Sequence, residues 1–107
     1  VAWGAVSEDG RLKLAINALT AMRVVDADGA PDLSHGGGLD AIAPGSSAWF
    51  DASPVVGPSL VICGHWSALG LHRREGLLAL DSGCVHRRCL SAVRLEDGEL
   101  AQEPYAD

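Results

Sequence analysis

The sequence lacks the features of several common protein classes. It has no apolar run close to the roughly 20 residues that span a bilayer, and no charged segment leads into a signal-like apolar core. Lys and Arg total 8 against 14 Asp and Glu, so the formal net charge is −6, and no basic stripe offsets it. These absences give no support to a membrane or exported protein and exclude a broad nucleic-acid surface. We expect a cytoplasmic protein.

Cysteine is also scarce, with three residues in the chain. In an intracellular protein, so few cysteines favour free thiols or metal ligands over a disulfide framework. The 107 residues permit one domain at most. The sequence begins at Val1 without an initiator methionine, and residues 24–59 are rich in Gly, Pro and Ser with little periodicity. A loop that long is uncommon unless missing structure braces it, so we expect residues 1–107 to be a piece of a longer domain.

The first half of the chain contains one helical pattern. Ser7 or Asp9 can cap a helix, and apolar residues at helical spacing between residues 11 and 22 predict a short amphipathic helix. The members of that apolar stripe are Leu12, Ala15, Ile16, Leu19 and Met22. A strand can begin after Arg23, with a turn at Asp28-Gly29. In the rest of the long loop, residues 48–50 (Ala-Trp-Phe) form a hydrophobic anchor.

The second half, residues 60–103, is predicted to be rich in strands. Residues 60–63 and 76–81 are apolar enough for buried strands, the second ended by Ser82-Gly83. Residues 90–96 and 99–102 flank Asp97-Gly98, which is a strong hairpin signal. One short helix followed by an antiparallel or mixed sheet gives the α+β class.

His65 is the first candidate for a functional residue. It follows Gly64 directly after an apolar strand, and Gly64 allows a sharp turn at that point. A histidine at the end of a rigid strand can be held as a metal ligand. The alternative is a half-buried histidine that hydrogen-bonds to a neighbour, and the local sequence by itself favours this alternative.

Two further sets of residues each allow more than one interpretation. Three cysteines and two histidines together have the chemistry of a zinc site, although their spacing departs from the usual motifs, and buried thiols explain the cysteines equally well. The members of this set are Cys63, His65, Cys84, His86 and Cys89. The doublets Arg73-Arg74 and Arg87-Arg88 can face a polyphosphate, but solvated arginines are the more common case. Trp66 can stack on a base or pack in the interior.

Several segments together resemble one known family. Residues 11–23 (RLKLAINALTAMR) resemble the R-L-R-x-x-x-N-A-[FL]-T-R-M-R segment of the bacterial symmetrical diadenosine tetraphosphatases. Residues 48–50 are similar to that family's P-W-F, and residues 64–67 to its G-H-W-[AS]. Residues 75–84 and 90–97 resemble its E-G-x-x-A-L-D-T-G-C and L-T-A-L-R-L-E-D. The matches follow the family's order along most of the chain, which makes the resemblance specific.

This resemblance implies a calcineurin-like metallophosphoesterase with a four-layer αββα sandwich and two divalent metal ions (Mn, Co or Mg) at the strand ends. The reaction it implies is cleavage of diadenosine tetraphosphate into two ADP by metal-activated water. By resemblance, His65 is a metal ligand, which reverses the local preference. Arg11, Arg23 and Trp66 become candidates for binding the dinucleoside polyphosphate.

The family's other ligand motifs, G-D-x-H-G, G-D-x-V-x-x-G, G-N-H-D and H-A-G, are absent from this sequence. We therefore expect the C-terminal portion of the enzyme, with one metal ligand, no assigned catalytic residue, no activity alone and a tendency to self-associate. Two departures stand out: Ala21 replaces an arginine of T-R-M-R, and residues 85–88 (VHRR) replace a W-G-G-type run. The alternatives are another phosphoprotein-phosphatase-like enzyme, a small Cys/His zinc module and a structural subunit without chemistry.

Overall fold

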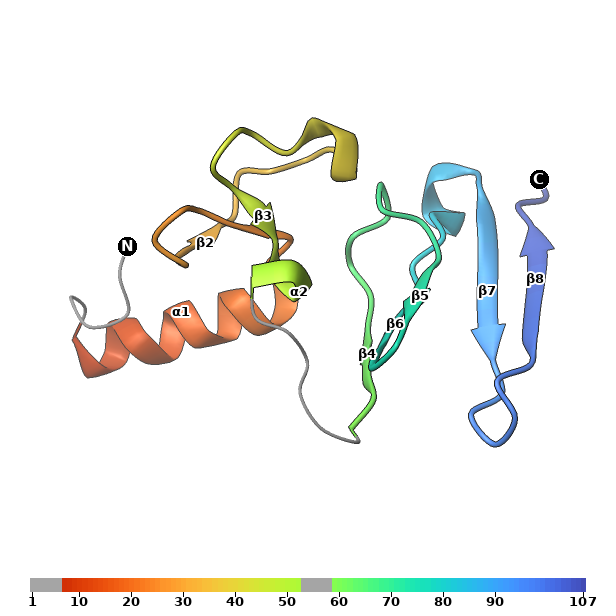
Figure 1. The fold of residues 1–107 in the computed structure, drawn as a ribbon. Coiled ribbons are helices and arrows are strands. Elements are labelled where there is room, and N and C mark those ends of the chain that lie inside the picture. The colour runs from red at the N-terminus through yellow and green to blue at the C-terminus, as the bar shows by residue number, and fades with distance from the viewer. Residues whose placement is uncertain (1–6, 53–58) are drawn as a thin grey trace. The chain divides into compact units, whose positions relative to one another are not determined.

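The structure is a computed structural model that describes residues 7–52 and 59–107. The chain divides into two units, Val1–Pro54 and Val55–Asp107, and each unit has its own small sheet or sheets (Figure 1). Helices and strands occur together, so the predicted α+β class is confirmed.

The first unit begins with helix α1, Glu8–Ala21. The Ser7 side-chain oxygen accepts a hydrogen bond from the Gly10 N–H at 3.2 Å, and two acidic residues in the first turn suit the positive end of the helix dipole. The predicted helix and its Ser7 cap are confirmed, and the helix begins at Glu8 instead of Arg11.

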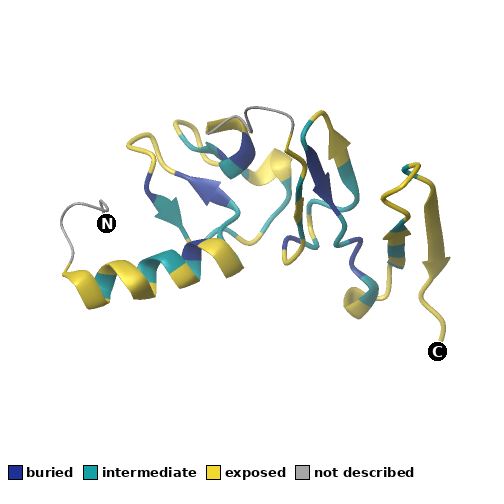
Figure 2. Ribbon diagram, turned by 90° about the horizontal axis from the view of Figure 1, so that it is seen from below, coloured by how far each residue is buried: buried dark blue, intermediate teal, exposed yellow. Residues whose placement is uncertain are grey.

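The apolar stripe predicted for this amphipathic helix is largely exposed in the structure. Leu12, Ile16 and Leu19 are 64%, 53% and 87% exposed, and Ala18 is the buried residue of the helix (Figure 2). The strands of the same unit are two residues long, which is about 7 Å, whereas a 14-residue helix is about 21 Å long. So small a sheet offers too little surface to cover the helix.

Short elements lie within the segment predicted as a long loop. Strands β1 (Val24–Val25), β2 (Pro31–Asp32) and β3 (Ser47–Ala48) form an antiparallel sheet in the order β2-β1-β3. The 3-10 helix η2 (Leu39–Ala41) precedes β3, and helix α2 (Trp49–Ala52) follows it. The strand after Arg23 and the turn at Asp28-Gly29 are confirmed, with Gly29 at φ 82°.

Phe50 anchors this first unit. It is 1% exposed, as are Val24 and Ala48, and its ring meets that of Trp49 edge-on at 5.5 Å between centroids. The hydrophobic anchor predicted at residues 48–50 is therefore confirmed.

In the second unit, strands β4 (Val61–Cys63), β5 (His72–Arg74) and β6 (Leu77–Ala79) form a sheet in the order β4-β6-β5. Strand β4 runs parallel to β6, and β5 runs antiparallel to it. All three residues of β6 are buried, which confirms the second predicted strand. The prediction that residues 60–63 are buried is wrong: Leu60, which precedes β4, and Ile62 within it are 51% and 45% exposed. Among the described strands, β4 lies at the edge of its sheet.

The chain ends in the predicted hairpin. Strands β7 (Cys89–Val93) and β8 (Leu100–Pro104) pair in antiparallel register around the Asp97-Gly98 turn, where Gly98 has φ 75°. The 3-10 helix η3 (Cys84–His86) connects β6 to β7. None of the described helices combines the length and the apolar character that a bilayer span requires.

Candidate functional site

His65 lies in a tight turn directly after β4. Its side chain is exposed, and its backbone has φ 72°, a left-handed conformation that is uncommon outside glycine. Three backbone hydrogen bonds close the turn: Ser67 N–H to His65 O, Leu69 N–H to Trp66 O and Gly70 N–H to Ser67 O, each at 3.1 Å. Strained residues of this kind persist only where the surroundings hold them, and they concentrate at functional sites.

Trp66 follows the exposed His65 but is itself buried, with 4% of its surface exposed. Burial agrees with the packed alternative for this tryptophan. An indole ring that is covered on both faces has no surface left on which a base can stack. Base stacking by Trp66 therefore stays a prediction that would require this side chain to become exposed.

The two arginine candidates belong to the other unit. Arg11 is exposed in the first turns of α1, whereas Arg23 is half-buried. Arg23 Nη1 donates a hydrogen bond to the His35 carbonyl at 2.7 Å, and its own carbonyl accepts the Trp49 N–H at 3.0 Å. Among the described residues, no acceptor meets the buried Nε of Arg23. The guanidinium group of Arg23 is thus partly engaged in hydrogen bonding within its own unit, whereas that of Arg11 is exposed and more accessible to a ligand.

His35 is a residue that the sequence reasoning did not single out. Its Nε2 lies 2.8 Å from the Gly37 carbonyl oxygen and 3.3 Å from that of Gly38. Carbonyls only accept, so Nε2 carries the ring proton in this arrangement. The available signal was the run Ser-His-Gly-Gly-Gly at residues 34–38, where glycines leave the backbone carbonyls accessible to a neighbouring ring.

The structure does not support a zinc site made by the cysteines and histidines. Among residues 7–52 and 59–107, no group of three or more His, Cys, Asp or Glu side chains is arranged to hold a metal ion. Burial raises the pKa of the Cys63 thiol, which favours the neutral thiol over the thiolate that zinc needs. All three cysteines are free thiols, as expected for this composition.

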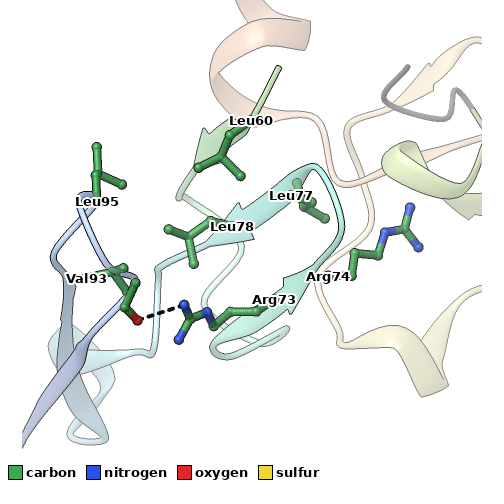
Figure 3. Close-up of a pocket in the computed structure, with 8 residues that line it drawn as sticks. Leu60, Arg73, Arg74, Leu77, Leu78, Val93 and Leu95 are labelled. Carbon is green, nitrogen blue, oxygen red and sulfur yellow. Dashed lines mark hydrogen bonds between the residues drawn. The ribbon is translucent and has the colours of Figure 1, made fainter. Parts of the chain in front are cut away.

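The doublet Arg73-Arg74 borders a pocket of about 140 Å³ in the second unit (Figure 3). Arg73 Nη2 donates a hydrogen bond to the Gly98 carbonyl at 2.9 Å, which joins β5 to the hairpin turn. The pocket is lined by Leu60, Arg73, Arg74, Leu77, Leu78, Val93, Leu95 and Gly98. Ligand pockets usually measure about 300–1,000 Å³, so this pocket is too small for a dinucleotide, and it excludes His65.

Comparison with known proteins connects the chain to one enzyme family, although no family model matches it. It is 47% identical over 93 residues to a protein of Nitrosospira multiformis named bis(5'-nucleosyl)-tetraphosphatase, symmetrical. Proteins of the same name from Chromobacterium violaceum and Nitrosomonas europaea are 44% and 41% identical over 95 and 97 residues. These alignments cover 86%, 88% and 90% of this chain.

The chain spans about a third of the length of these relatives: 34%, 34% and 36%. The resemblance inferred from the ordered motifs is thereby confirmed. The chain is a relative of the symmetrical bis(5'-nucleosyl)-tetraphosphatases and corresponds to about one third of such a protein.

Proposed function

We propose that this chain is the C-terminal third of a metal-dependent hydrolase that cleaves diadenosine tetraphosphate symmetrically into two ADP. The observation that carries the proposal is the identity of 41–47% to relatives bearing that name, extending over most of the chain. The remaining two thirds of the enzyme, and with them the other catalytic groups, would come from polypeptide outside these 107 residues.

In this proposal His65 is a ligand of one of two divalent ions, with Mn, Co or Mg as candidates. An exposed imidazole on a turn fixed at a strand end suits that role, because a metal ligand needs an accessible nitrogen on a well-held backbone. When bound, the ions would supply the activated water and stabilise charge on the phosphoryl oxygens. His65 alone cannot assemble such a centre, so the isolated chain should be inactive.

The arginines are proposed to contact the polyphosphate. The guanidinium group of Arg11 is exposed, and guanidinium groups bind phosphate oxygens through paired, charge-assisted hydrogen bonds. Arg23 would contact the polyphosphate from a more fixed position, because its guanidinium group already donates a hydrogen bond to the His35 carbonyl. Trp66 is kept as a weaker candidate because it is buried.

The proposed architecture is a four-layer αββα sandwich, of which the β4-β6-β5 sheet is one part. Two features support a larger assembly. Strand β4 has one side without a partner strand among the described residues, and the apolar side chains of Ile62 in β4 and of Leu60 just before it are about half exposed. Additional strands from the rest of the protein would cover both.

The test is hydrolysis of diadenosine tetraphosphate by the longer polypeptide that carries this chain, assayed with added Mn²⁺. We expect His65→Ala to lower kcat/KM by about 100-fold or more, because removal of a metal ligand weakens the whole centre. His86→Ala is the matched control, since His86 is also exposed and lies in the same unit. Equal activity of the His65 variant and the wild type would remove His65 from the site, and an inactive wild type would reject the proposed function.

A further inference from the structure

The loop between β6 and β7 is closed tightly at its base. The side chain of Ser82, 8% exposed, donates to the Cys89 carbonyl at 2.7 Å and lies 2.6 Å from the Ser91 hydroxyl. Within the loop, the His86 and Arg88 N–H groups both donate to the Gly83 carbonyl, at 2.9 and 3.0 Å. This closure brings the backbone of Arg88 next to Gly83.

Arg88 lies directly over the backbone of Gly83. Gly83 has φ 78°, and a Cβ placed on it would lie 2.5 Å from the Cζ of Arg88, a separation that real Cβ atoms essentially never show. The guanidinium therefore occupies the space that any side chain at position 83 would need. Glycine is favoured here by the left-handed backbone, and a side chain at this position would in addition have to displace the Arg88 guanidinium.

The same guanidinium reaches the turn that carries His65. Arg88 Nη2 donates a hydrogen bond to the Ser67 carbonyl oxygen. That oxygen also accepts the Gly70 N–H, and the Ser67 N–H donates to the His65 carbonyl. Arg88 thus holds the residue whose own hydrogen bonds define the turn at His65.

We propose that Arg88 is a positioning residue for His65, an inference that rests on the proposed function. His65 has a left-handed backbone, and a non-glycine residue keeps such a conformation only when its surroundings fix it. A charged guanidinium on a carbonyl is a stronger restraint than a neutral donor. Arg88 acts through Ser67 and touches neither substrate nor metal in this role.

The neighbouring Arg87 provides a matched control. Its guanidinium lies 5.9 Å from the centroid of the Tyr105 ring, near the end of the chain. Both arginines are exposed members of the Arg87-Arg88 doublet, so removing either one changes the net charge equally. Of the two arginines, Arg88 is the one that donates a hydrogen bond to the Ser67 carbonyl.

The test measures how the hydrolase activity of the longer polypeptide depends on Mn²⁺ concentration. We expect Arg88→Ala to raise the half-saturating Mn²⁺ concentration by about 10-fold, as loss of outer contacts of a metal ligand typically does. Gly83→Ala should have a similar effect because it displaces the guanidinium, and the double variant should be little worse than either single one. Arg87→Ala should match the wild type.

Two outcomes would overturn the inference: a wild-type Mn²⁺ requirement in Arg88→Ala, or an equal rise in Arg87→Ala. If Arg88 had a purely structural role, Arg88→Ala would lower the thermal midpoint without changing the Mn²⁺ requirement. That result would also reject the inference. The contact itself is tested in the 107-residue chain by amide NMR, where Arg88→Ala should shift the Ser67 and Gly70 signals and Arg87→Ala should not. If those shifts occur but the wild-type polypeptide hydrolyses nothing, the proposed function fails, and with it the metal role of Arg88, while the contact stands.

Discussion

Ile62 in β4 and Leu78 in β6 are register partners in a parallel pair, yet Ile62 is 45% exposed and Leu78 is 4% exposed. The difference agrees with strand order, because among the described strands β6 has a neighbour on each side and β4 has one. The outer side of β4 combines apolar side chains with backbone groups that no described strand pairs, which is the usual starting point for association.

The first prediction concerns self-association of the isolated chain. We expect the 107-residue chain to form dimers or larger species, and Ile62→Lys to shift it toward monomer, because a charge on an edge strand opposes strand addition. The measurement is molar mass by light scattering over a range of concentrations. Leu39→Lys is the control, since Leu39 is 44% exposed but lies in η2 outside any sheet. Equal effects of the two variants, or a monomeric wild type, would contradict the prediction.

The second prediction concerns the core of the second unit. Leu77 in β6 is 1% exposed, so Leu77→Ala should lower the free energy of unfolding by about 2–5 kcal/mol through lost burial and the cavity left behind. Leu95→Ala, at a position 61% exposed, should cost about 0.5 kcal/mol or less. Urea denaturation followed by the amide signals of β6 and β7 measures both. Similar costs for the two variants would mean that β6 is not the centre of this core.

The third prediction separates stability from function at His65. The left-handed backbone costs a non-glycine residue about 1–2 kcal/mol, so His65→Gly should raise the free energy of unfolding by about 1 kcal/mol. The same change removes the proposed metal ligand, so activity of the longer polypeptide should fall as stability rises. Ser67→Gly, at a position without positive φ, should instead lower stability by about 0.5–1 kcal/mol. Thermal unfolding of the chain distinguishes the two, and a loss of stability in His65→Gly would remove the argument from strain.

The fourth prediction concerns pH and the hairpin turn. The hydrogen bond from Arg94 lowers the pKa of Asp97 below its usual value of 3.8, with a smaller contribution from the Glu99 N–H. A carboxyl whose pKa is lower in the folded state stabilises that state above the unfolded pKa. This contribution should therefore be complete above about pH 5. It should shrink as the pH falls through the unfolded pKa, and it should be lost below the folded pKa. NMR titration of the Asp97 carboxyl and of the β7 and β8 amides measures it.

Arg94→Ala is the control for this prediction. Removing the guanidinium should return the Asp97 pKa toward its usual value, because Arg94 is the main cause of the shift. Asp97→Asn should remove the part of the acid-dependent change that comes from this carboxyl. An Asp97 pKa that is unchanged by Arg94→Ala would assign the shift to the backbone N–H groups instead.

The elements that the sequence predicted correctly depend on local chemistry. Ser7 caps α1 through a bond to a residue three positions away, and Asp97-Gly98 turns the hairpin between adjacent strands. Strand β6 needs only a short apolar run ended by Ser82-Gly83. The family resemblance was also accessible, because the motifs lie in order along the chain and the comparisons confirm them.

The predictions that failed depended on what packs against each element. Periodicity shows which side chains are apolar but not whether a partner covers them, so neither the exposure of Leu19 nor that of Ile62 could be inferred from spacing.

The sequence by itself determined the helix, the hairpin, the α+β class and the relationship to a hydrolase family, since each depends on neighbouring residues or on ordered motifs. Only the tertiary structure decided that β4 is an edge strand, that His65 has a left-handed backbone and that Arg88 meets Ser67. The physical reason is sequence distance. Arg88 and Ser67 are 21 positions apart, and contacts over such distances arise from chain closure, which local propensity does not encode.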